Sequence, residues 1–241
     1  MSTAKQLSQQ LKQLGEYLKH KKVIKDESPI STASRNLLRN SKRCHIQGLE
    51  LTSIEGDYIR PDWHKALNVK LTIDVEIKEH YRFEDVKKII INLEYSALHK
   101  DDKRECKGAW HFDYHVDMDE TGEPEVHRVM HPNYHVHHGG HRVKELDSYG
   151  DMVLLKNPRL MHHPLDALLA IDLALSNFLP LDKWEKLRAD TGYQMMMKKS
   201  QTNWWKPYYE TLGNYWNNKS SKGQKSQKLV TKSLELNPHL L

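Results

Sequence analysis

Residues 67–78 read LNVKLTIDVEIK, a stretch in which apolar and polar side chains alternate strictly. A repeat of two residues with many β-branched side chains is typical of a β-strand with one buried and one polar face. Residues 85–95 contain three consecutive isoleucines, at positions 89 to 91, and predict a second, more deeply buried strand. The centre of the chain is therefore predicted to form a β-sheet.

Two further strands are predicted on residues 109–117 and 133–138, with a turn between them. In both strands, aromatic or aliphatic residues alternate with histidine or aspartate. Ten of the sixteen histidines of the chain lie between His111 and His163. If the two strands pair as an antiparallel hairpin, one face gathers imidazoles and a carboxylate, and the other face directs its aromatic rings into the core.

Helical patterns flank these strands on both sides. Five segments have helical periodicity or composition: residues 2–22, 31–43, 165–179, 181–189 and 191–217, the last with a kink or break at Pro207. We predict an α+β protein, in which an antiparallel sheet of about four strands is covered on one face by C-terminal helices and carries an N-terminal helical extension. Three regions follow: a helical basic segment (1–60), an α+β core domain (61–217) and a flexible tail (218–241).

Composition narrows the classes of function. The net charge of +5 and the pI of about 8.9 are compatible with a nucleic-acid partner. Candidate phosphate contacts are the basic residues of the second predicted helix, Arg35, Arg39, Lys42 and Arg43. No ATP-binding P-loop, dinucleotide fingerprint, serine-hydrolase elbow or HExxH motif is present, which disfavours those enzyme classes.

The two cysteines, Cys44 and Cys106, bear on metal chemistry and on location. They form no CxxC pair, which excludes a cysteine-based zinc site, and two lone cysteines suit a reducing compartment. The first 22 residues lack the apolar core of a signal peptide, and no stretch reaches the roughly 18 apolar residues of a membrane span. We therefore expect a cytoplasmic protein that does not enter the membrane.

The first functional hypothesis is a ribonuclease that uses histidines as acid and base. His135 and His137 would exchange the protons of the 2′-hydroxyl and of the leaving oxygen, with His115 close by. Asp113 would orient one ring, and Arg142 would stabilise the charge on the phosphate.

The second hypothesis is a metallo-hydrolase. An HxH pair on one strand has good geometry for Zn²⁺ or another divalent metal, with His115 or Asp113 as the third ligand and an open water position. The candidate metal ligands are His111, His115, His135 and His137. In a variant of this hypothesis, an HNH-like nuclease, residues 136–138 would lead the motif, and Asn157 and His163 would complete it.

The hairpin also resembles a known family. WHFDYHVD (110–117), a turn and HPNYHVHHGG (131–140) are similar to the TumE-like bacterial toxins, small proteins with an aromatic YxYH-type strand and a following PHHxH-like segment. The matching positions are Phe112, Tyr114, His115, His131, Pro132, His135, His137, His138 and the helix at 165–178. The resemblance covers residues 67–180, and VHRVMHPN (126–133) stands where the family has an RxDN-type run. It implies a toxin or antiviral-defence endoribonuclease.

The third hypothesis is a subunit without enzymatic activity. It would bind nucleic acid through the basic segment, or a protein partner through the C-terminal tail. The histidine-triad nucleotide hydrolases are set aside, because Gly139 occupies the position of the third histidine in their HxHxH pattern.

Overall fold

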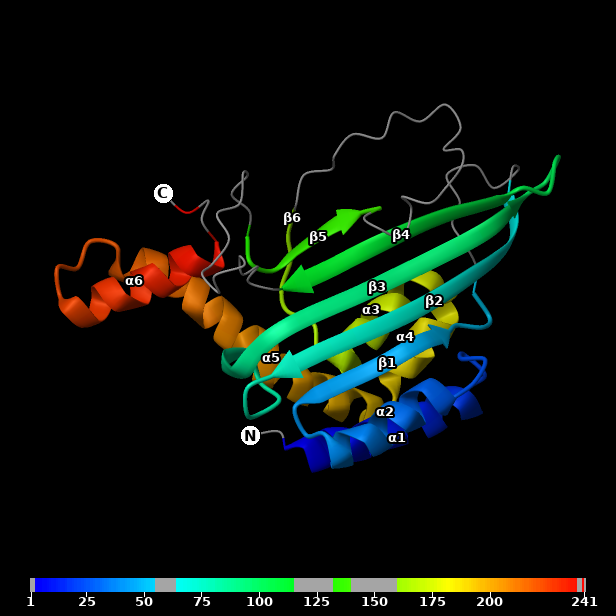
Figure 1. Ribbon diagram of the computed structural model, residues 1–241, viewed down its shortest axis with the longest axis horizontal. Helices are drawn as coiled ribbons and strands as arrows, with labels where there is room; N and C mark the ends of the chain where they lie inside the picture. Colours follow the sequence, from blue (N-terminus) through cyan, green and yellow to red (C-terminus); the bar gives the residue numbers. More distant parts are fainter. Residues whose placement is uncertain (1–2, 55–63, 115–131, 140–159, 238–239, 241) are drawn as a thin grey trace, which may run out of the picture.

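The computed structural model describes residues 3–54, 64–114, 132–139, 160–237 and 240, and Figure 1 shows their arrangement. Candidate residues His115 and Arg142, together with His131 and Asn157, lie outside these ranges. Within them, none of the helices combines the length and the apolar character that a membrane crossing requires.

The N-terminal region forms a pair of helices, α1 (Ala4–His20) and α2 (Ser28–Arg39). Thr3 caps α1 by accepting a hydrogen bond from the Gln6 backbone amide, and the side-chain oxygen of Gln6 accepts one from the Thr3 backbone amide. The leucines of α1 repeat at helical spacing and are all buried: Leu7, Leu11, Leu14 and Leu18. The first predicted helix is thus confirmed.

The described strands form one antiparallel sheet in which neighbours in sequence are neighbours in space. In order, they are β1 (Arg43–Glu50), β2 (His64–Ile77), β3 (Val86–His99), β4 (Glu105–Tyr114), β5 (His135–His138) and the two-residue β6 (Leu160–Met161). A short 3₁₀ helix, η1 (Phe83–Asp85), precedes β3. Each predicted strand is present, and β1 and β6 enlarge the predicted sheet.

Four helices follow the sheet: α3 (Ala167–Phe178), α4 (Leu181–Ala189), α5 (Thr191–Asn218) and α6 (Gln224–Leu236). Asp166 starts α3 by accepting a hydrogen bond from the Leu169 amide. In Figure 1, α3 and α4 lie behind the sheet, and α1 and α2 lie beside its β1 edge. One continuous apolar cluster joins both groups of helices to the sheet. The predicted fold class, α+β with C-terminal helices against an antiparallel sheet, is confirmed.

The opposite face of the sheet is polar, as the alternation in residues 67–78 predicts. Cross-strand register aligns Thr72, Asn92, His111 and His137 in one row of this outer face. The next row contains His45, Asp74, Ile90, Asp113 and His135. The outer face therefore carries the hydrogen-bonding and charged side chains, and the helix-covered inner face carries the core.

Four details of the prediction differ from the structure. The second helix spans 28–39 rather than 31–43, because Pro29 is accepted in its first turn and the chain turns into β1 at Arg43. The predicted boundary at residue 60 falls between β1 and β2, which pair along most of β1. Residues 224–236, predicted as flexible tail, form α6, and α5 continues through Pro207 without dividing.

Replacing Gly108 with alanine should destabilise the fold by about 1–3 kcal/mol, the usual cost of overfilling a packed site. A Cβ atom at this position would lie 2.4 Å from the ring of Tyr95 on the neighbouring strand. That ring is also held by a 3.1 Å contact between its hydroxyl and Nε2 of His138. Urea unfolding measures the effect. Gly213→Ala is the control, since its added methyl group would meet no atom within 4 Å apart from its chain neighbours and the backbone of its own helix. Equal destabilisation by both variants would contradict the prediction.

Candidate metal centre

The pairing of β4 with β5 brings the predicted histidine and aspartate residues together. His111 lies opposite His137, and Asp113 lies opposite His135. Because side chains on a strand alternate, all four project from the outer face. Trp110, Phe112 and Val136 belong to the inner face, although Trp110 is 38% exposed and packs against the ring of His138.

Asp113 is the centre of this group and is buried. Its Oδ2 lies 3.1 Å from Nε2 of His111, and its Oδ1 lies 2.6 Å from Nε2 of His135. Burial on its own would raise the pKa of the Asp113 carboxyl, but the contacts with His111 and His135 outweigh burial and hold the pKa well below its usual value. The side chain is therefore a carboxylate at neutral pH.

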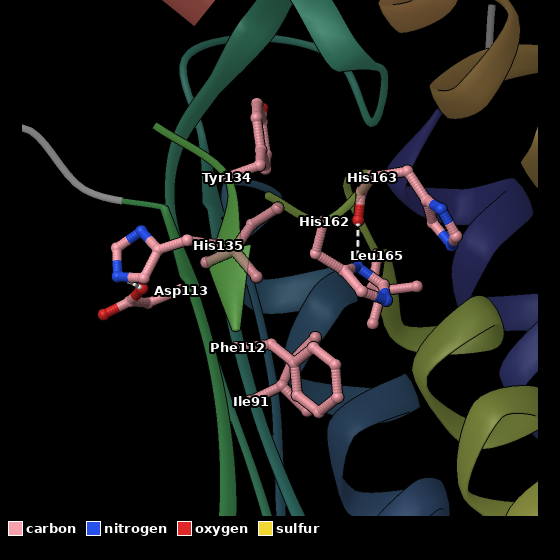
Figure 2. A pocket seen from close by; sticks show the side chains of 9 residues that line it. Ile91, Phe112, Asp113, Tyr134, His135, His162, His163 and Leu165 are labelled. Carbon is pink, nitrogen blue, oxygen red and sulfur yellow. Dashed lines mark hydrogen bonds and ion pairs between the residues drawn. The ribbon is translucent and has the colours of Figure 1, made fainter. Parts of the chain in front are cut away.

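His135 contacts Asp113 from the neighbouring strand, β5. It is only 2% exposed, and its Nδ1–H donates to the carbonyl oxygen of Pro132 at 3.0 Å. Its Nε2 lies 2.6 Å from Oδ1 of Asp113. Figure 2 shows this pair on one side of β5, with Phe112 and His162 on the other. Both nitrogens of His135 thus already face acceptors.

His111 is oriented by a residue that sequence patterns did not indicate. Its Nδ1 lies 2.6 Å from Oδ1 of Asn92 on β3, and an amide oxygen only accepts, so Nδ1 carries the hydrogen. Nε2 also faces an acceptor, Oδ2 of Asp113 at 3.1 Å, so it would have to release its hydrogen to bind a metal. Metal-binding histidines are commonly held in this way, by an acceptor on the nitrogen that does not bind the metal. Asn92 is a single polar residue after the isoleucine run, but only the register of β3 with β4 reveals its partner.

His111, Asp113 and His137 form a group with the composition of a metal site. One ligand atom from each residue lies within 4.8 Å of the other two. The ring of His137 lies 4.9 Å from that of His111, centre to centre. Zinc accepts imidazole nitrogen and carboxylate oxygen at about 2.0–2.2 Å, so the three ligand atoms would have to move closer together to share one coordination sphere. Three protein ligands leave a position open for water or substrate.

A small cavity adjoins the group on its inner side. Its volume is about 10 Å³, and Figure 2 shows the residues around it, including Tyr134, His162 and Leu165. This volume holds no more than about one water molecule, so no substrate enters here. Chemistry at Asp113 must therefore be approached from the outer face of the sheet.

The predicted nucleic-acid contacts lie at the opposite edge of the sheet. Arg35 and Arg39 are exposed on α2, and Lys42 is exposed just before β1. Arg43, instead, binds the carboxylate of Asp74 through two nitrogens, at 2.7 and 3.0 Å. Three strand spacings separate β1 from β4, or about 14 Å, so these residues do not line the metal centre itself.

Two residues of the HNH-like alternative, His138 and His163, lie apart from the group. His138 faces the inner side, where its Nε2 contacts the hydroxyl of Tyr95. His163 precedes α3 and packs against Trp205 of α5, with ring centres 4.4 Å apart. Among the described residues, the HxD pair, His111 and Asp113, therefore lies next to the HxH pair, His135 and His137. Neither His138 nor His163 belongs to this group.

The packing of His163 makes the fold sensitive to acid. Burial, with a smaller contribution from neighbouring His162, lowers the pKa of His163 from 6.5 to about 4. As pH falls from 6.5 toward 4, the unfolded chain takes up a proton that the folded chain refuses, so stability should be lost across this window. Urea unfolding at stepwise pH measures the loss. His163→Gln should reduce it, exposed His20→Gln should not, and identical pH profiles for wild type and His163→Gln would contradict the prediction.

A search of protein-family models, of curated proteins and of solved structures finds no match to this chain. The candidate function therefore depends on the site itself. The toxin resemblance of the hairpin remains a prediction.

Proposed function

We propose that this protein is a metal-dependent hydrolase that cleaves phosphodiester bonds in nucleic acid, with RNA as the favoured substrate. The observation that carries the proposal is the convergence of His111, Asp113 and His137 on the outer face of the sheet. Two imidazoles and one carboxylate are a donor set of catalytic zinc sites, which keep a fourth position open. The toxin or defence context suggested by the hairpin is part of the proposal.

The residues of the site would have two roles: some would bind the metal, and others would orient the metal-binding side chains. A bound divalent ion supplies an activated water and polarises the phosphate oxygens. His111 and His137 would each give one nitrogen, and Asp113 would give Oδ2. His135 would keep the second oxygen of Asp113 occupied, and Asn92 would fix the proton of His111 on Nδ1. The half-buried rings of His111 and His137 would meet the substrate from solvent.

A metal-free mechanism with His135 and His137 as the acid and base has less support. A catalytic acid or base must come within hydrogen-bond distance of the proton that it transfers. His135 is almost completely enclosed, and its two nitrogens face Pro132 and Asp113. The geometry therefore favours a role for His135 in orienting Asp113, and it favours a metal-dependent mechanism over the metal-free one.

Metal analysis of the purified protein, followed by cleavage assays, tests the proposal. We expect about one divalent ion per chain, cleavage of a single-stranded RNA, and loss of both in His137→Ala. His45→Ala is the matched control, because His45 lies on the same face at β1 but outside the group. Absence of bound metal together with chelator-resistant activity would refute the metal route. Two histidines and one carboxylate also form the iron sites of oxygenases. If the purified protein contains iron instead of zinc and cleaves no RNA, the proposed hydrolase activity is wrong.

A further inference from the structure

Excess positive charge is concentrated in the segment that follows α5 and continues through most of α6. Residues 217–234 contain five lysines and no acidic residue: Lys219, Lys222, Lys225, Lys228 and Lys232. The whole chain has 37 basic and 32 acidic side chains, so outside this segment the two are equal in number. We call residues 219–232 the basic arm. Its concentrated positive charge suits it to binding a polyanion.

The helical geometry of α6 aligns these charges. Lys225, Lys228 and Lys232 follow one another at three and four residues, so they share one face of the helix, and all three are exposed. Neither they nor Lys222 form an ion pair with any residue that the structure describes. Lys222, Lys225, Lys228 and Lys232 are therefore available to an external anion.

The other side of α6 is already used in packing. Ser233 is fully buried and donates a hydrogen bond to the carbonyl oxygen of Thr211 on α5 at 2.6 Å. Leu229 and Val230 are half-buried, and Leu236 packs against the core cluster. A helix that lies in a membrane surface must insert its apolar face among the lipids. Because α6 directs that face toward the protein, its lysines favour nucleic acid over a lipid surface.

The end of α6, just beyond the basic arm, contacts the segment that precedes β5, the strand that carries His137. The carbonyl oxygen of Leu236, at the end of α6, accepts a hydrogen bond from the amide of Asn133 at 3.3 Å, two residues before His135. Along α6, Lys232 lies about 6 Å and Lys225 about 16 Å from that point. Trp216, at the end of α5, is 66% exposed beside the first lysine. An indole in this position offers a surface on which a base stacks.

We propose that the basic arm binds the phosphate backbone of a single-stranded nucleic acid where that strand extends beyond the metal centre. The inference rests on the proposed function for the identity of the substrate. Lys225, Lys228 and Lys232 contact successive phosphates, and Trp216 stacks on a base. The arm anchors the strand, and the metal centre cleaves it.

Fluorescence anisotropy of the full chain with a short labelled single-stranded RNA, in chelator and over a range of salt concentrations, tests the proposal. Lys225→Gln/Lys228→Gln/Lys232→Gln should weaken binding at least about tenfold at low salt and reduce the slope of log K against log salt by about two, since each phosphate contact contributes about 0.7. Trp216→Ala should weaken binding without changing the slope. Lys5→Gln/Lys12→Gln/Lys183→Gln, which removes three exposed lysines elsewhere, should leave both quantities unchanged.

An unchanged slope in the α6 triple variant would overturn the proposal. So would lysine-dependent binding to vesicles containing phosphatidylserine, if RNA itself does not bind. Because the assay contains chelator and no turnover, it separates the two proposals. If the metal-centre proposal is wrong, the protein binds RNA but does not cleave it when zinc is supplied. If the basic-arm proposal is wrong, the protein cleaves RNA, and the triple variant leaves the salt dependence of binding unchanged.

Discussion

Asp113→Asn should abolish tight metal binding and reduce RNA cleavage by more than about a hundredfold, because even residues that only support a ligand contribute 10–100-fold to metal affinity or activity. The amide keeps the shape of the carboxylate but loses its negative charge, and its nitrogen would face either His111 or His135. Zinc titration, metal content and initial cleavage rates measure the change.

Asp74→Asn is the matched control for this variant. Asp74 is also buried on the outer face, but it binds Arg43 rather than a histidine. Its replacement should lower stability without lowering metal affinity. If Asp113→Asn binds zinc as tightly as wild type, or if Asp74→Asn loses zinc equally while folded, the assignment of the metal centre is wrong.

Trp204→Ala should cost about 3–5 kcal/mol of folding free energy, as expected for removing a large buried side chain from a packed core. Trp204 is 1% exposed on α5 and belongs to the cluster that joins the helices to the sheet. For a chain of this size, the melting temperature should fall by roughly 10 °C, at about 2–4 °C per kcal/mol.

Trp216→Ala, on the same helix, supplies the comparison. Its ring is mostly exposed, so its removal should change stability by less than about 0.5 kcal/mol. Calorimetry or urea unfolding of the two variants decides the matter. Similar melting temperatures for both would show that α5 does not anchor the core through Trp204.

Local patterns predicted much of this fold. The alternation in residues 67–78 identified β2, and the leucine spacing of the N-terminal region identified α1. The hairpin of β4 and β5 has the register that the facing histidines required. These elements share one property, since each reports its secondary structure through its own periodicity.

Other features depend on contacts that are distant in sequence. β1 contains an irregularity between Ile46 and Leu49, which interrupts the alternation that would identify a strand. The first turns of helix α6 are polar and lysine-rich, so this part of the sequence resembles a linker, and the helix is stabilised by its packing against α5. The partnership of Asn92 with His111 follows from the pairing of β3 with β4, which no single segment encodes.

Strand β5 is short, four residues long, and its outer neighbour β6 has only two. Short edge strands of this kind open locally at low energetic cost. An ion bound by His111 and Asp113 on β4 and by His137 on β5 would stabilise the pairing of the two strands. The ion binds tightly only when β4 and β5 are paired, so its binding free energy favours the paired state. The amide hydrogens of residues 135–138 would then exchange with solvent more slowly in the metal-bound protein. The ion proposed for catalysis would therefore also stabilise this edge of the sheet.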